Sequence, residues 1–200
     1  MRQLQPKPPW SRADYWSRPV PGFGDTRARI CLVGLAPGAH GANRSGRPFT
    51  GDGAGDFMYP LLHRAGFASR PDAVSRDDGL VLKDLYITNA VKCLPPGNKP
   101  VAREFASCRP WLEQELTRLA RLRVIVALGG DAFRSLLQLY RAAGHIARLA
   151  DHPFGHGVVY RFDQAPTLVG SYHTSRYNIQ TGRLTEAMFL ELLEQVRRLL

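Results

Sequence analysis

The stretch GLAPGAHGANRSGRPFTGD, residues 34–52, decides the fold because it separates an expected strand from an expected helix. Residues 29–34 form a short apolar run that predicts a buried strand, and residues 53–67 predict a helix capped by Asp52. The stretch is rich in glycine and proline, so its backbone can approach a ligand closely, and the amide groups at the helix start favour an anion. The loop is therefore expected to bind a phosphate or to stabilise a negative charge that develops during a reaction.

This loop alone does not identify a function, because it lacks both Gly-x-Gly-x-x-Gly and a Gly-Lys-Ser/Thr ending. A purely structural turn therefore stays open as an alternative. The loop also carries polar side chains around one aromatic ring, that of Phe49. An apolar ring beside convergent polar groups suits a flat, polar ligand such as a nucleobase. The polar residues are His40, Asn43, Arg44, Arg47 and Asp52.

Strand and helix patterns alternate along the rest of the chain. Strands are expected at residues 85–91, 123–128, 157–162 and 167–171, and helices at residues 101–119, 131–143 and 184–200. This alternation predicts an α/β fold with a parallel sheet covered by helices on both faces. We expect one domain over residues 25–200, preceded over residues 1–24 by an extended arm or a partly ordered leader. Pro60 and Pro110 lie inside helical windows and should kink or split those helices.

The chain is strongly basic, with 27 Lys and Arg against 17 Asp and Glu, a net charge of +10 and a pI near 10.1. This balance favours a polyanionic partner, most often nucleic acid, although charge alone also fits a membrane-surface or ribosome-associated protein. The sequence has no apolar run of about eighteen residues and no apolar signal-peptide core near Met1. We expect a cytoplasmic protein.

Polar loops follow the expected strands at the point where each strand ends. They cover residues 34–52, 92–100, 129–130 and 171–183. Ligands of open α/β sheets bind beyond the carboxyl ends of the strands, so these loops should meet at one edge. Together with the positive charge, they predict a cleft that faces nucleic acid.

Four motifs in these loops resemble one known family. They are PVPGFGD, GLAPGAHGANRSGRPFTGD, YITNAVKCLPPGNKP and SYHTSRYNIQTGRLT, and the match covers residues 15–200 in order. The chain resembles the iron–sulfur uracil-DNA glycosylases, in the family 5 (type B) branch of bacteria and archaea. The resemblance implies a three-layer α/β/α sandwich with a central four-stranded parallel sheet. It also implies base-excision repair by hydrolysis of the N-glycosidic bond of a flipped-out deoxynucleotide.

The resemblance implies a base pocket lined by the backbone of Gly34, Ala36 and Gly38 together with the side chains of Phe49 and Asn89. An aromatic ring can stack on an extruded base, so we expect this role for Phe49, unless it is a core residue that closes the loop. A side-chain amide both donates and accepts, as uracil O4 and N3–H require, which fits Asn89. The alternative is an Asn89 hydrogen bond that ties down the adjacent loop.

Catalysis is expected from His173 and Asp52. Cleavage leaves negative charge on the base, mostly over N1 and O2, and His173 is the best candidate to donate to O2. Many members of the superfamily carry an acid two residues before Pro37, where this chain has Leu35. Asp52 is the acid left in the loop, and a helix-capping role is compatible with a catalytic one. The group that activates the attacking water stays open.

The loop SYHTSRYNIQTGR also predicts a wedge that enters DNA, with Tyr177, Asn178 and Ile179 filling the gap left by the extruded nucleotide. An ordinary surface loop is the alternative. Basic residues here and in the other loops should hold phosphates. These expected phosphate contacts are Arg44, Arg47, Lys92, Lys99, Arg176 and Arg183.

Cysteines are few, and Cys31, Cys93 and Cys108 do not suggest a disulfide framework. The family holds a [4Fe-4S] cluster with an early Cys-x-x-Cys pair and two later cysteines, and Cys93 and Cys108 match the later pair. The early pair is absent from this sequence, so two thiolates cannot meet the four-cysteine rule. Either the native chain begins upstream, or this member has lost the cluster.

The leading hypothesis is a monomeric, non-membrane DNA glycosylase that leaves an abasic site in double-stranded DNA containing deaminated bases. Uracil is the expected base, with hypoxanthine and xanthine as further candidates, because Asn89 favours uracil whereas Leu35 goes with a wider range. The first alternative is a non-catalytic nucleic-acid-binding domain on the same scaffold. The second is an α/β enzyme acting on a small phosphorylated molecule, which leaves the +10 charge unexplained.

Overall fold

A six-stranded mixed sheet forms the centre of the protein, in a computed structural model that describes residues 4–200. The strand order is β1-β3-β2-β4-β6-β5. Four adjacent strands are parallel, and they are β2 (Ile30–Gly34), β3 (Leu85–Asn89), β4 (Val124–Leu128) and β6 (Ala165–Ser171). These four strands confirm the parallel sheet that the sequence predicts. They are apolar because helices cover both of their faces.

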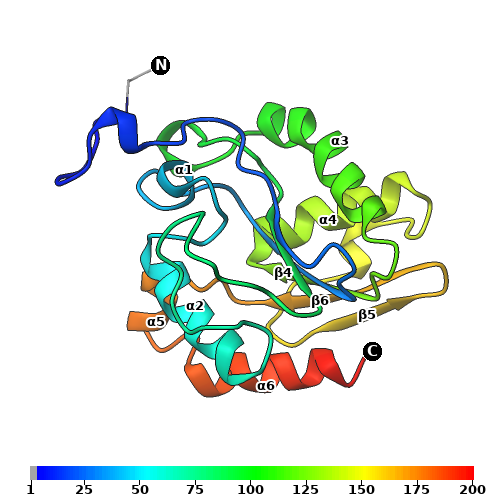
Figure 1. The fold of residues 1–200 in the computed structure, drawn as a ribbon. Coiled ribbons are helices and arrows are strands. Elements are labelled where there is room, and N and C mark those ends of the chain that lie inside the picture. Colours follow the sequence, from blue (N-terminus) through cyan, green and yellow to red (C-terminus); the bar gives the residue numbers. More distant parts are fainter. Residues whose placement is uncertain (1–3) are drawn as a thin grey trace.

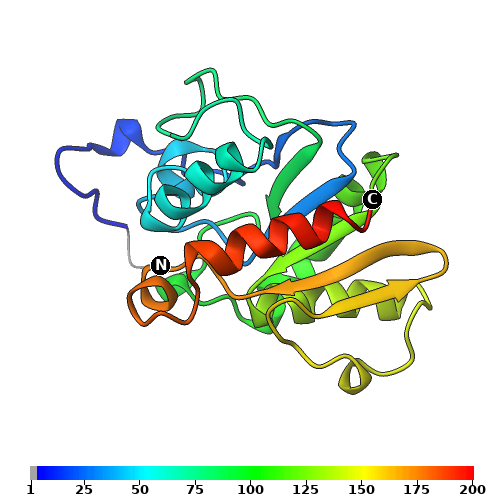
Figure 2. The same cartoon turned by 90° about the horizontal axis from the view of Figure 1, so that it is seen from below.

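Helices form a layer on each face of the sheet, which gives the three-layer sandwich seen in Figure 1. One layer holds α2 (Gly53–Arg64) and α6 (Glu186–Arg197), and the other holds α3 (Ala102–Arg118) and α4 (Gly130–Ala142). Alternate residues of each strand enter opposite layers, as period-two geometry requires. In β2, Leu32 packs toward the first layer, whereas Cys31 and Val33 pack toward the second. Figure 2 shows α6 lying across the sheet.

Two antiparallel edge strands extend the sheet beyond its four parallel strands, and the sequence predicts one of them, at residues 157–162. β1 (Phe23–Gly24) pairs with β3, and β5 (Val159–Phe162) forms a hairpin with β6. The sequence predicts no strand at β1, because a two-residue segment is too short to show a period-two pattern. The end of the expected arm therefore belongs to the sheet, and Met1–Gln3 lie outside the described residues. Three short 3-10 helices complete the fold: η1 (Arg12–Asp14), η2 (Pro96–Asn98) and η3 (Leu149–Asp151).

Neither proline splits its helix, so that part of the prediction is wrong. Pro60 lies inside α2 and Pro110 lies inside α3, and both helices continue past them. A proline removes one backbone donor and costs about 3 kcal/mol in a helix interior. In α2, Met58, Leu61 and Leu62 are fully buried against the sheet on either side of the proline. Burial of such side chains contributes roughly 1.5–3 kcal/mol each to the free energy of unfolding, and together they outweigh the cost of the proline.

The loops after the parallel strands meet at one edge of the sheet, called here the carboxyl edge. The loop after β2 contains the short helix α1 (Ala42–Ser45), and the loop after β6 contains α5 (Arg176–Gln180). Both lie with the start of α2 on the left of Figure 1. The sequence expectation of convergent loops is therefore confirmed. Those loops hold nearly all the predicted site residues.

Candidate active site

Gly34, Phe49 and Asn89 touch one another at the carboxyl edge. Asn89 ends β3 and is paired in register with Gly34 at the end of β2. A Cβ atom on Gly34 would overlap Oδ1 of Asn89 and lie 2.6 Å from Cζ of Phe49, so this position has room for glycine only. Asn89 and Phe49 are 3% and 6% exposed. The structure thus joins an amide and an aromatic ring that are far apart in the sequence.

His173 completes the group from the loop after β6. Its ring centroid lies 6.0 Å from that of Phe49, with the planes 33° apart. Gly129, at a φ of 100°, follows β4 and packs against the His173 side chain, while Asn178 donates from Nδ2 to the His173 carbonyl oxygen over 2.8 Å. Burial lowers the pKa of His173, and the charge of Asp52 partly opposes this shift. At neutral pH the imidazole is therefore uncharged.

Asp52 caps α2 and also faces the loop after β2. Its Oδ1 accepts from the backbone amides of Ala54, over 3.1 Å, and Gly55, over 3.2 Å. Its Oδ2 lies 3.0 Å from the place that a Cβ of Gly38 would take, and a Cβ of Gly41 would overlap it. One carboxylate oxygen thus holds the helix while the other faces the glycine-rich loop. Asp52 can therefore cap α2 with one oxygen while its other oxygen stays available for a catalytic role.

A cavity of about 230 Å³ opens beside His173 at this edge. It reaches Leu35, Gly129 and Asn178, with Arg183 at its rim. Phe49 and Asn89 do not line it, and both are buried. The backbone positions Ala36 and Gly38 lie in that loop and are half-exposed. Phe49 thus lies near His173 and, across Gly34, near Asn89, but the cavity reaches only the histidine, so the predicted common pocket is not open in this structure.

Two of the six basic residues predicted to hold phosphates are buried in ion pairs, so this prediction is wrong for them. Arg47 is 1% exposed and pairs with Asp78, and Lys92 is 5% exposed and pairs over 2.5 Å with Glu115. Their acidic partners come from segments 31 and 23 residues away in the chain. Arg44 is half-buried, because its Nε donates to the His40 carbonyl oxygen and its guanidinium covers a tryptophan ring.

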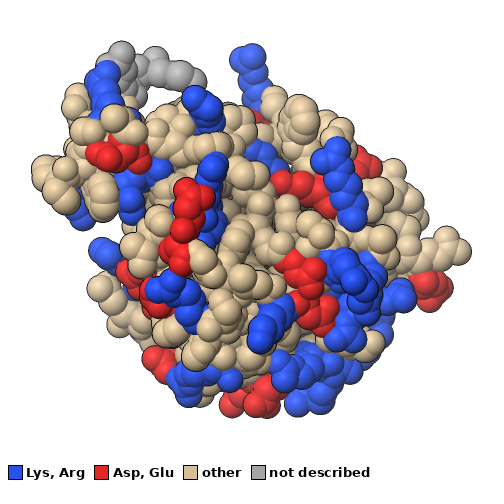
Figure 3. Space-filling view, viewed as in Figure 1, with Lys and Arg blue, Asp and Glu red and all other residues tan. Residues whose placement is uncertain are grey.

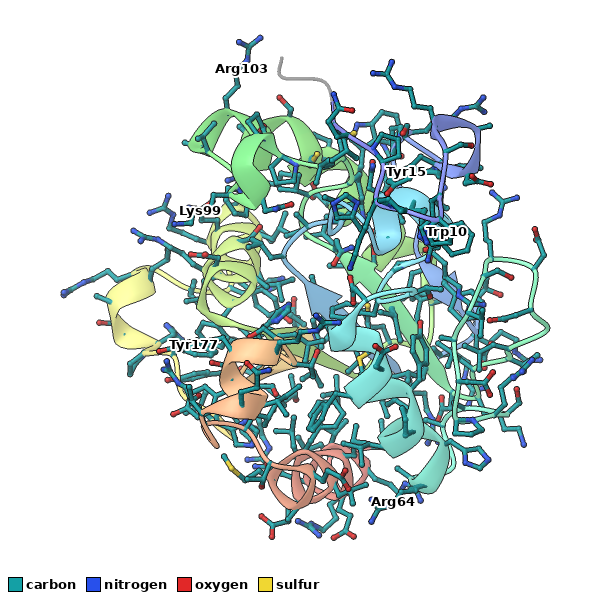
Figure 4. All side chains as sticks on the ribbon, turned by 90° about the vertical axis from the view of Figure 1, so that its left-hand side faces the viewer. Trp10, Tyr15, Arg64, Lys99, Arg103 and Tyr177 are labelled. Carbon is teal, nitrogen blue, oxygen red and sulfur yellow. The ribbon has the colours of Figure 1, made fainter. Side chains whose placement is uncertain are left out.

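Four of the other residues predicted to contact DNA are exposed to solvent. Tyr177 is 70% exposed on α5, and Lys99, Arg176 and Arg183 are also exposed. Figure 4 looks onto the carboxyl edge and shows Tyr177 and Lys99 on one side of it. Asn178 differs from the prediction because its amide points inward to the backbone of His173, where a wedge would need to project into DNA.

Positive charge does not form one continuous patch on the face drawn in Figure 3, because acidic side chains lie among the Lys and Arg side chains. This face therefore shows no basic patch that would mark a nucleic-acid-binding surface. At the carboxyl edge, the exposed Arg183 lines the cavity beside His173.

Comparison with known proteins supports the same assignment. Residues 21–197 match the family model described as the uracil DNA glycosylase superfamily. The chain belongs to the uracil-DNA glycosylase superfamily. It is 54% identical to a type-5 uracil-DNA glycosylase of Thermus thermophilus, over 92% of this chain and 82% of the relative. It is 44% identical to the type-5 enzyme of Pyrobaculum aerophilum, over 93% of this chain and 77% of the relative.

A type-4 uracil-DNA glycosylase of Archaeoglobus fulgidus is more distant, with 35% identity over 60% of this chain and 53% of the relative. The resemblance to the type-5 branch therefore extends over more of the chain than the resemblance to the type-4 branch. This agrees with Leu35, which stands where many superfamily members carry an acid. The fold of this superfamily member is the predicted α/β sandwich, extended by two edge strands.

The cysteines of this superfamily member do not fit a four-cysteine cluster. Cys93 is exposed and Cys108 is half-buried, with the Lys92 amide donating to Sγ of Cys108 over 3.4 Å. Cys31 is buried in β2, where burial raises the pKa of its thiol. Residues 4–200 contain no group of three or more His, Cys, Asp or Glu that could hold a metal ion.

Within residues 4–200, every helix is too short or too polar to span a membrane.

Proposed function

We propose that this protein is a DNA-repair glycosylase that flips a deaminated base out of double-stranded DNA and hydrolyses its N-glycosidic bond. The single observation that carries the proposal is the meeting of Phe49, Asn89 and His173 at one end of the sheet. An aromatic ring, an amide and a neutral imidazole are the three groups needed to stack, recognise and activate one base. Membership of the superfamily supports the same reaction.

Asn89 provides base recognition in this proposal. Its amide can donate to a ring carbonyl oxygen and accept from the neighbouring ring N–H. Uracil offers this pair as O4 and N3–H, and hypoxanthine and xanthine offer the same pair as O6 and N1–H. One buried amide therefore reads all three deaminated bases. Cytosine and adenine have an amino group in place of this carbonyl, so they present a donor to the Asn89 donor.

His173 stabilises the leaving base. As the glycosidic bond breaks, its electron pair goes to the base, and charge develops on N1 and O2. The neutral imidazole donates one N–H toward O2, and it is positioned before the reaction because Asn178 and Gly129 fix its backbone and ring. The charge of Asp52 acts on His173, and its Oδ2, which faces the glycine-rich loop, would orient water or stabilise the cationic sugar.

DNA binds across the carboxyl edge in this proposal. Arg176 begins α5 and Arg183 follows it, and the side chain of Arg176 lies over Gly53 at the start of α2. Tyr177 is 70% exposed on α5 and would fill the gap left by the extruded nucleotide. A monomer is sufficient in this proposal, because one chain supplies the ring, the amide, the imidazole and the acid.

Release of free base tests the proposal. In a single-turnover assay, the protein is expected to release uracil from a duplex containing a single uracil and to leave an alkali-labile abasic site. Duplexes with hypoxanthine or xanthine are expected to react as well, and duplexes with cytosine or adenine to stay intact. Salt-sensitive DNA binding with no abasic product in any duplex would instead indicate a non-catalytic nucleic-acid-binding domain.

The wedge role of Tyr177 has its own test. Replacing Tyr177 with alanine is expected to lower the rate on duplex DNA about tenfold and to leave the rate on single-stranded DNA within twofold. The reason is that only a duplex requires the gap to be filled. Trp111→Ala is the matched control, because Trp111 is 60% exposed on α3, away from the carboxyl edge. Equal losses on both substrates would contradict a wedge.

A further inference from the structure

Phe49 has an unusual backbone conformation for a bulky residue, with a φ of 53°. This left-handed region is uncommon outside glycine, and such strain costs of order 1–3 kcal/mol where neighbouring contacts maintain it. The strained residue is the one whose ring stands between Asn89 and His173. The contacts that maintain this conformation therefore decide where the ring points.

Side chains hold both neighbours of Phe49. The Pro48 carbonyl oxygen accepts from the Tyr59 hydroxyl over 3.0 Å and from Oγ1 of Thr50 over 3.2 Å. The Thr50 carbonyl oxygen accepts from Oγ of Ser45 over 3.0 Å. Helix α2 also presses directly on Phe49, because a Cβ atom on Gly55 would overlap the Phe49 carbonyl oxygen. The segment is thus held from several directions.

Arg47 and Asp78 form the buried centre of this support. The guanidinium donates to both carboxylate oxygens of Asp78, over 2.8 and 2.6 Å, and its Nε donates to Oγ1 of Thr50 over 2.9 Å. It also covers the ring of Phe23 at 4.8 Å. A bidentate pair fixes direction as well as distance, so Arg47 cannot turn without losing several bonds.

Asp78 anchors the pair from a distant segment, residues 69–82, called here the Asp78 loop. Its carboxylate also accepts from the backbone amides of Val74, Ser75 and Leu80. Burial raises the pKa of Asp78, but the Arg47 and backbone hydrogen bonds outweigh this and hold the pKa well below its usual range. Asp78 stays charged through the neutral range, and the pair persists there.

We propose that Asp78, acting through Arg47, is a positioning residue that holds the Phe49 ring in its base-stacking place. This role rests on the proposed glycosylase function. The Asp78 loop contributes no side chain to the group formed by Phe49, Asn89 and His173, yet it fixes the geometry of that group. A displacement of about 1 Å in such a group can cost roughly a hundredfold in rate.

A double-mutant cycle tests the proposal with uracil-containing duplex DNA. Asp78→Asn is expected to lower the single-turnover rate about 30-fold, while the Kd for undamaged duplex stays within twofold. In a Phe49→Ala background, the same substitution is expected to cost less than twofold, because the ring that it positions is already gone. A purely structural role would give equal losses in both backgrounds and would overturn the proposal.

The Arg29–Asp84 pair provides a matched control. It is also a side-chain pair between arginine and aspartate, and it lies at the opposite end of β2, away from the carboxyl edge. Asp84→Asn is expected to leave the rate within twofold even if it lowers the melting temperature. A rate loss in Asp84→Asn as large as in Asp78→Asn would overturn the proposal, since it would reflect general destabilisation.

Milder variants keep the test decisive if Asp78→Asn does not fold. Thr50→Val removes one bond to Arg47, and Arg47→Lys keeps the charge but loses the bidentate geometry. Each is expected to lower the rate at least fivefold, with the loss again absent in the Phe49→Ala background. Full activity of both variants would overturn the proposal. An inactive wild-type protein would instead count against the proposed function, so the two failures are distinguishable.

Discussion

Replacing His173 with alanine is expected to lower the single-turnover rate of uracil release by about a hundredfold or more. The substitution removes the donor that the proposed mechanism directs at the departing base, and loss of one such donor typically costs about 10²–10³ in rate. The measurement is release of free uracil from a duplex at saturating enzyme. A rate within threefold of the wild type would remove His173 from the mechanism.

His145→Ala is the matched control for this substitution. His145 is exposed at the end of α4 and packs against Tyr140, in the helix layer formed by α3 and α4. Its replacement is expected to leave the rate within twofold. Both substitutions remove one imidazole. A loss of rate in His173→Ala alone would therefore show that the location of His173 matters, and not merely the loss of a histidine.

The protonation state of His173 predicts the shape of the pH profile. Burial lowers its pKa, with Asp52 partly opposing, so the imidazole stays neutral above about pH 6.5. We expect a rate that is flat from pH 6.5 to 8.0. A mechanism that needs the imidazolium would instead lose about 30-fold over that range. The burial of a neutral imidazole also contributes stability that is present above about pH 6.5 and is lost as the pH falls below it.

Replacing Asn89 is expected to have the second large effect. Asn89→Ala leaves the base without its donor and acceptor, and Asn89→Asp keeps the size but loses the donor at neutral pH. Both are expected to lower the rate of uracil release about a hundredfold or more. The reason is that the buried polar groups of a site that hydrogen-bonds its substrate are left unpaired when one partner is missing. Release of hypoxanthine and xanthine is expected to fall in parallel, since the same amide reads all three bases.

Asn98→Asp is the control for Asn89→Asp, because Asn98 is exposed in η2 on the adjoining loop. It is expected to leave all three rates within twofold. If Asn89→Asp released uracil at the wild-type rate, Asn89 would have only the structural role of tying down its loop. If uracil release alone fell, the wider substrate range would depend on other residues.

Several site residues could be predicted from the sequence because they lie where strands end. Asn89 ends β3 and His173 follows β6, and the parallel sheet brings such positions to one edge. Asp52 was predicted from the capping pattern before α2, and its side chain does cap that helix. These predictions depend on local periodicity and on a general rule of sheet topology.

Other features gave no local signal. β1 is two residues long, and its partner is β3, more than sixty positions along the chain. The closed position of Phe49 and Asn89 also depends on packing, because the same residues could line an open pocket. Likewise, the Asn178 side chain donates to the His173 backbone, a bond set by how the loop folds into α5.

The sequence by itself determined the parallel core, the polar loops at its carboxyl edge and the residue types that we propose to recognise and release a base. The apolar and polar residues that define the strands and helices recur at short intervals along the chain, so these elements can be predicted from local sequence. Only the tertiary structure decided which basic residues are free. Arg47 and Arg183 look alike in the sequence, but Asp78, from a segment 31 positions away, buries Arg47 in an ion pair, while Arg183 stays exposed. The reason is that a charge leaves water only where a partner has been brought to it, and long-range packing alone brings that partner.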